Sequence, residues 1–110
     1  MKVLYIFKSS DSSTILEKMI IPQLEKETHG AEVVGLFFFA DNVYFFLPEN
    51  PIGEKLSRLS VKLKFFVLCC DYCCEQRGIS GRLYPGIEEG CFPDVYKLAE
   101  EKGAQQVITL

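Results

Sequence analysis

Short, almost uninterrupted apolar runs alternate along this chain with stretches whose apolar residues recur at helical spacing. The runs cover residues 2–8, 32–39 and 64–69, and two further short strands are expected at 86–89 and 105–110. Apolar runs of this kind are typical of strands buried on both faces. Helical spacing marks the stretches between them, at residues 14–28, 52–63, 71–77 and 93–102. Strict strand–helix alternation predicts an α/β fold, with a parallel sheet covered by helices.

Local signals predict where several of these helices begin and end. Thr14 and Glu17 have the spacing of a capping box at the start of the first helix. Pro22 removes a backbone donor inside that helix, so a kink is expected near it. Gly78 and Gly103 are glycines just past predicted helix ends, where a left-handed backbone is common. Asp41–Asn42 is expected to be a turn followed by an irregular connection.

Length and composition indicate one ordered domain over residues 1–110. Hydrophobic residues make up 48% of the chain and charged residues 25%, which is too apolar for a disordered segment. The net charge is −3 and no cluster of Lys and Arg stands out, so we expect no nucleic-acid partner. The longest apolar stretch, residues 33–40, is too short to span a bilayer. The first apolar run is interpreted as a strand rather than a signal peptide, so we expect no membrane partner and no export.

The most unusual feature is a cluster of cysteines. Cys69, Cys70, Cys73 and Cys74 fall within six residues, and Cys91 is the fifth cysteine of the chain. A disulfide framework would distribute its cysteines along the chain in even number. Clustered thiols without an export signal indicate the reducing cytoplasm, where they serve catalysis, redox chemistry or metal binding.

The expected fold brings these thiols to one place. Ligands of open parallel sheets bind beyond the carboxyl ends of the strands. Cys69 and Cys70 end the third predicted strand, the segment from Asp41 follows the second, and Cys91 precedes the last helix. A thiol at a helix N-terminus is stabilised as the nucleophilic thiolate, which makes Cys70 the best candidate nucleophile, although the neighbouring Asp71 opposes the effect. Cys69 and Cys91 are equally well explained as small buried hydrophobes, and for Cys74 this is the favoured interpretation.

Other residues carry weaker signals. His29, the only histidine, is interpreted as an exposed turn residue, so chemistry of the Cys–His type has little support. The aromatic segments 37–39 and 44–46 are more typical of a core or a subunit interface than of a ligand site. Arg77 is placed to bond carbonyls in the last turn of its helix.

The segment from Cys70 to Ile79 resembles the DsrE/DsrF/TusD family of sulfur-relay proteins, in which a strand ends in a cysteine and an Arg-Gly pair closes the short helix that follows. Here Cys70 is matched by its spacing to Arg77 and Gly78. Two further stretches are similar to the family: residues 37–43, with Asp41 in the turn, and the region from Gly90 to the last strand.

The resemblance implies a three-layer α/β/α fold with a five-stranded parallel sheet and flavodoxin-like layering, assembled into homo-oligomers such as trimers or hexamers. It also implies a persulfide relay, in which Cys70 accepts sulfane sulfur from a donor protein and passes it to an acceptor protein. Such a sulfurtransferase or sulfur carrier requires no metal or organic cofactor. Cys73 is the second expected catalytic thiol, and the supporting residues are Cys69, Cys74, Cys91, Asp41 and Arg77.

Three other functions fit the same residues. Cys70 and Cys73 form a Cys-x-x-Cys pair at a strand-to-helix junction, as in dithiol redox proteins. Soft thiolates favour zinc, copper(I) or iron–sulfur clusters, with Cys70, Cys73, Cys74 and Cys91 as the ligands. A non-catalytic subunit of a hetero-oligomer would use the aromatic segment 37–46 as its interface.

Overall fold

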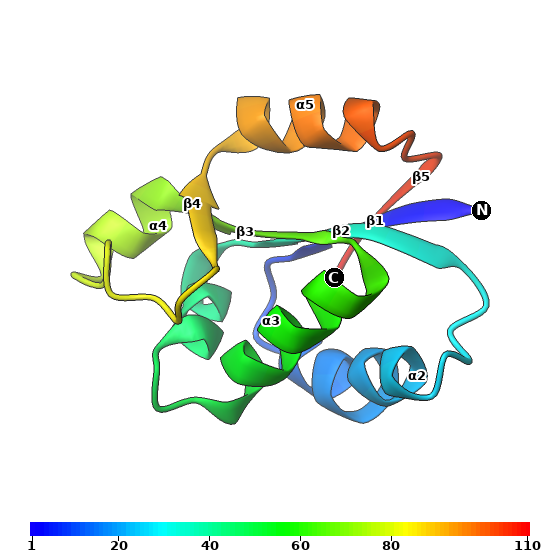
Figure 1. Ribbon diagram of the computed structural model, residues 1–110. Coiled ribbons are helices and arrows are strands. Elements are labelled where there is room, and N and C mark those ends of the chain that lie inside the picture. The colour runs from blue at the N-terminus through cyan, green and yellow to red at the C-terminus, as the bar shows by residue number, and fades with distance from the viewer.

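The computed structural model describes residues 1–110 and contains a sheet of five parallel strands (Figure 1). The strand order is β4-β3-β2-β1-β5, so the chain begins one strand in from an edge, adds β2, β3 and β4 in turn on one side, and returns to add β5 on the other. The strands are β1 (Lys2–Phe7), β2 (Glu32–Phe38), β3 (Phe66–Cys70), β4 (Glu88–Gly90) and β5 (Gln106–Thr109). Every pairing is parallel, which confirms the expected α/β sheet.

Helices cover both faces of the sheet. Figure 1 shows α5 alone on one face and the helices around α2 and α3 on the other, while α4 lies beyond the end of β3. This is the three-layer α/β/α arrangement that was expected. The helical elements are α1 (Ser12–Ile15), the π-helix η1 (Leu16–Ile20), α2 (Ile21–Glu25), the 3₁₀-helix η2 (Ala40–Phe46), α3 (Pro51–Leu63), α4 (Asp71–Gln76) and α5 (Phe92–Glu101).

The core is built around β2, which is buried along almost its whole length. Phe38 stacks on Phe7 of the adjacent strand, with ring centroids 4.7 Å apart. The same Phe38 ring meets Phe46 of η2 edge-on at 4.6 Å. Aromatic pairs of this geometry add to the free energy gained from burial. Phe37, Phe38 and Phe46 thus lie in the core, where they anchor η2 against the sheet, while Tyr44 in the same aromatic segments is exposed.

The first helix differs from its expected form. It begins at Ser12 rather than Thr14, and no side chain caps it, so the capping box predicted for Thr14 and Glu17 is wrong. A π-helical turn, in which the Ile21 N–H donates to the Leu16 carbonyl, lies directly before Pro22. The proline has no N–H to continue a regular pattern, and the wider turn takes the place of the kink expected there.

Two connections at the carboxyl edge of the sheet also differ. The segment after β2, expected as a turn and an irregular connection, forms the 3₁₀-helix η2, which Ala40 enters in a left-handed conformation with φ 56°. The fourth strand lies at Glu88–Gly90, two residues later than expected. Because β2 and β3 are neighbours, η2 and α4 both start from the same edge, and this places them side by side.

Candidate functional site

The cysteine cluster lies at the carboxyl edge of the sheet, where β3 passes into α4. Strand β4 runs beside β3, with Cys69 opposite Glu89 and Cys70 opposite Gly90. Cys91 follows directly after that pairing, so it lies at the end of the neighbouring strand. The structure thus brings all five cysteines to the same edge of the sheet, but it gives them different surroundings.

Cys70 is both the last residue of β3 and the N-cap of α4. Its Sγ accepts a hydrogen bond from the Cys73 N–H at 3.4 Å. Only 5% of the residue is exposed. Burial raises the pKa of the Cys70 thiol from 9.0 to about 11, and the hydrogen bond from the Cys73 N–H only partly offsets it.

The helix N-terminus was expected to favour the Cys70 thiolate, but in the isolated chain the pKa of Cys70 is raised rather than lowered. Helix α4 has only six residues, so few aligned peptide dipoles act on the sulfur. Desolvation disfavours the charged form of a buried thiol, and here it outweighs the backbone N–H groups of Cys73 and Tyr72, which favour the thiolate. Cys70 is held as a neutral thiol near neutral pH.

Cys73 lies in the first turn of α4, three residues after Cys70, and is also buried. Its Sγ accepts a hydrogen bond from the backbone N–H of Ala40 at 3.2 Å. The left-handed conformation of Ala40 is uncommon for a residue other than glycine, and it occurs at the point where the chain turns from β2 into η2. This turn directs the Ala40 N–H at the Cys73 sulfur and so joins η2 to α4 beside Cys70.

Arg77 ties α4 to η2, and we call its contacts with Asp41 and Cys73 the Arg77 latch. The Arg77 Nε and Nη2 atoms each lie 2.9 Å from Asp41 Oδ1, while Nη1 donates to the Cys73 carbonyl at 3.1 Å. The guanidinium also lies 6.0 Å from the centre of the Tyr44 ring. The hydrogen bond to Asp41 raises the pKa of Arg77, so the latch stays charged. The sequence indicated Asp41 and Arg77 as two separate supporting residues. They meet because β2 and β3 are parallel neighbours, so the segments that follow these strands lie side by side.

Cys69 and Cys74 are completely buried. Burial raises the pKa of Cys74 to about 12, with a further contribution from the negative charge of Glu89, and it raises the pKa of Cys69 still more. Neither thiol meets solvent or ionises in the neutral range. Both side chains fill the core beneath the β3–α4 junction, as small hydrophobes do.

Cys91 caps the start of α5 and is only partly buried. Its thiol donates to Asp94 Oδ2 at 3.4 Å, and the same oxygen accepts the Cys91 N–H at 2.9 Å. The hydrogen bond to the carboxylate raises the pKa of Cys91, and the two bonds lower that of Asp94. Cys91 is thus held as a thiol by its own helix cap.

The cysteines do not converge as metal ligands within one chain. No three His, Cys, Asp or Glu side chains are placed so that together they could hold a metal ion. The set expected for a metal site, Cys70, Cys73, Cys74 and Cys91, is therefore not assembled by this fold. Two or more chains would have to share ligands for such a site to form.

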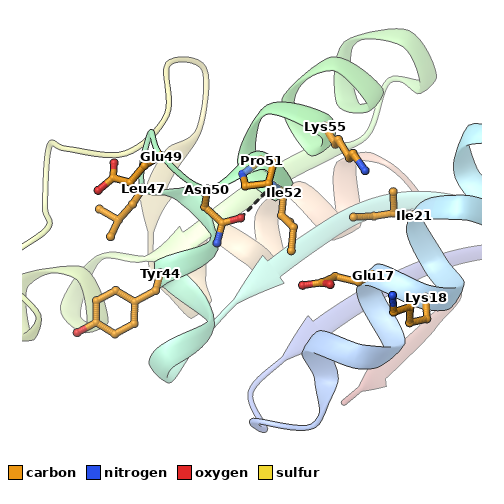
Figure 2. A pocket seen from close by; sticks show the side chains of 10 residues that line it. All are labelled: Glu17, Lys18, Ile21, Tyr44, Leu47, Glu49, Asn50, Pro51, Ile52 and Lys55. Atoms are coloured by element: carbon orange, nitrogen blue, oxygen red, sulfur yellow. Dashed lines mark hydrogen bonds between the residues drawn. The ribbon is translucent and has the colours of Figure 1, made fainter.

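A cavity of about 620 Å³ that no sequence pattern indicated lies on the other side of η2. Figure 2 shows Glu17 and Lys18 on one wall, and Tyr44 and the connection before α3 on the other. Asn50 caps α3 at its edge by accepting the Ile52 N–H at 3.0 Å. No cysteine lines this cavity, so it takes no part in thiol chemistry.

His29 is half-buried rather than exposed, which corrects the expectation for it. One ring nitrogen is 2.8 Å from the Tyr5 hydroxyl, and the other contacts the Ala31 backbone. The ring thus holds the turn before β2, at the amino edge of the sheet and far from the cysteines. Its role is structural.

Together these elements define the class of protein: a three-layer α/β domain with a five-stranded parallel sheet and a cysteine cluster at its carboxyl edge. None of the helices has the length and apolar character needed to cross a bilayer. No protein-family model matches the chain, and no curated protein matches it.

Solved structures share the fold over nearly the full length of the chain. The ychN protein from E. coli superposes with a TM-score of 0.70 at 23% identity, covering 99% of this chain and 97% of that protein. MTH1491 from Methanobacterium thermoautotrophicum, a protein of unknown function, gives 0.72 at 14% identity, with 99% and 98% covered. BT1422 from Bacteroides thetaiotaomicron, also of unknown function, gives 0.62 at 12% identity, with 98% and 94% covered. These likenesses establish the fold, which is consistent with the DsrE-like architecture expected from the sequence.

Proposed function

We propose that this protein carries sulfane sulfur as a persulfide on Cys70 and passes it to an acceptor thiol. The observation that carries the proposal is the position of Cys70 Sγ. It lies at the carboxyl end of the interior strand β3, and the Cys73 N–H is directed at it. That N–H can stabilise the negative charge that passes through the sulfur during transfer. The DsrE-like fold and the match of Cys70, Arg77 and Gly78 to the sulfur-relay pattern support the same role.

The transfer is an exchange at sulfur. The Cys70 thiolate attacks the outer sulfur of a donor persulfide, the S–S bond of the donor breaks, and the donor leaves as a thiolate. The proton lost by Cys70 is taken up by that leaving thiolate, so the products are a Cys70 persulfide and a donor thiol. Because Cys70 rests as a neutral thiol, its deprotonation limits the rate in the isolated chain.

Donor and acceptor proteins are the proposed partners, and the surface near the cysteines suits a protein contact. Tyr72 on α4 is 63% exposed, and Phe92, directly after Cys91, is 37% exposed. Aromatic side chains of this kind are enriched at protein interfaces. The outer strand β5 is exposed along its whole length, which supports association with further copies into the proposed trimer or hexamer, or with related chains. The five free thiols favour the reducing cytoplasm as its location.

Dithiol redox chemistry is the second candidate function, and one observation favours it. Cys70 and Cys73 occupy the same helical turn and contact each other through the Cys73 N–H, as the two cysteines of a redox pair would. A redox titration that finds no dithiol–disulfide couple would eliminate this candidate.

The test of the main proposal is intact-mass analysis after treatment with a small-molecule persulfide donor. Wild-type protein that is quenched immediately after loading should show the added mass of one sulfur atom, which a reductant removes. Cys70→Ser should gain none, while Cys91→Ser, the matched control at the same edge of the sheet, should load normally. Loading of Cys70→Ser to the wild-type level would refute the proposal.

A further inference from the structure

The cysteines near Cys70 differ in what they can do to a persulfide formed there. Cys69 and Cys74 are fully buried, and burial raises the pKa of each. Cys91 donates its thiol hydrogen to the Asp94 carboxylate, which holds it protonated in its own helix cap. Cys73 differs from these three because its sulfur accepts a hydrogen bond from another element, the Ala40 N–H at 3.2 Å.

Cys73 is also the cysteine that the fold holds against Cys70. The two residues share the first turn of α4, where the Cys73 N–H contacts Cys70 Sγ at 3.4 Å. Side chains three residues apart on a helix have Cβ atoms about 5–6 Å apart, and a disulfide requires about 3.5–4.5 Å. A shift of about 1–2 Å in this six-residue helix would therefore bring the two sulfurs into bonding distance.

We propose that Cys73 discharges the Cys70 persulfide as hydrosulfide. The Cys73 thiolate attacks Cys70 Sγ, the bond between Cys70 Sγ and the outer sulfur breaks, and that sulfur leaves as HS⁻ with both electrons of the bond. The two cysteines are oxidised to a Cys70–Cys73 disulfide while the sulfane sulfur is reduced to sulfide, so electrons balance without an external oxidant. A dithiol reductant then restores both thiols by exchange. This inference rests on the proposed function and names hydrosulfide as a product of the same site.

The contacts of Ala40 explain why Cys73 acts as the attacking thiol. Its N–H donates to Cys73 Sγ and holds that sulfur beside the β3–α4 junction, next to Cys70. The Arg77 latch holds α4 against η2 and so keeps Ala40 and Cys73 in contact. Cys91 is held instead in its own helix cap, where its thiol donates to the Asp94 carboxylate.

The test compares wild-type protein with Cys73→Ser and Cys91→Ser. Each is loaded with inorganic polysulfide, freed of excess reagent, and followed for intact mass and for released sulfide. Wild-type and Cys91→Ser proteins should lose the added sulfur, release one sulfide per chain and end two hydrogen masses below the reduced protein. Cys73→Ser should keep the added sulfur and lose sulfide release. Peptide mapping of the wild-type product should locate a Cys70–Cys73 disulfide, a result that does not depend on any variant folding.

The outcomes separate this inference from the proposed function. If wild-type protein loads but keeps its sulfur as long as Cys73→Ser does, discharge by Cys73 is refuted and the carrier function stands. A disulfide from Cys70 to Cys91 instead would also refute it. If no protein gains sulfur, the proposed function fails, and the inference fails with it.

Discussion

Breaking the Arg77 latch should expose the cysteine pair to reagents. Asp41 is 82% exposed at its side chain, so its ion pair with Arg77 is worth only about 0.2–1 kcal/mol. The bond from Arg77 Nη1 to the Cys73 carbonyl adds about 0.5–1.5 kcal/mol. Asp41→Asn, which loses only the charge, should therefore raise the population of the opened junction about 1.4- to 5-fold.

Arg77→Ala removes both contacts, and the loss of about 0.7–2.5 kcal/mol should raise the population of the opened junction about 3- to 70-fold. Arg77→Lys keeps the charge but lacks the planar fork that reaches both acceptors, so its effect should be intermediate. The assay is the rate at which uncharged iodoacetamide labels Cys70 and Cys73, resolved by mass spectrometry. High salt should speed labelling of the wild-type protein by weakening the ion pair.

A matched control is Glu54→Gln on α3, which breaks an exposed ion pair with Arg58 at 3.9 Å on another element. It should leave labelling unchanged. If Arg77→Ala is labelled no faster than wild type, the latch does not cover the thiols, and the reasoning about access to Cys70 is wrong.

Two further predictions concern ionisation and packing. Burial raises the pKa of Cys70 to about 11. The rate at which Cys70 is alkylated, followed by site-resolved mass spectrometry, should therefore rise about tenfold per pH unit from pH 7 to about 10. A plateau in this rate near pH 8 would contradict the prediction. A methyl group at Gly35 would collide with the Phe66 ring, so Gly35→Ala should lower the free energy of unfolding by about 1–3 kcal/mol in urea denaturation. An unchanged denaturation midpoint would show that the ring moves aside at little cost.

The sequence predicted the sheet well because strands that are buried on both faces consist almost entirely of apolar residues. The runs at 2–8 and 32–39 are apolar except for charged residues at their ends, and only a sheet covered on both faces buries such strands. The same regularity placed the cysteines, since Cys70 comes directly after a run of this kind. The clustering of the cysteines at one edge of the sheet followed from strand order alone.

The features that the sequence did not reveal depend on contacts between distant segments. The direction of the Cys70 pKa is decided by how far the β3–α4 junction is covered, which no local pattern encodes. The contact of Ala40 with Cys73 requires a left-handed residue where glycine would have been the usual signal. The link between Asp41 and Arg77 spans segments that share no periodic pattern.

The most direct test of the account locates the transferred sulfur atom. Wild-type protein and Cys74→Ser are exposed to a persulfide donor, trapped at once with an alkylating reagent, digested and mapped by tandem mass spectrometry. The account predicts the extra sulfur between Cys70 and the trapping group in both proteins, before any disulfide has formed. Sulfur found only on Cys91, or on no cysteine at all, would contradict it.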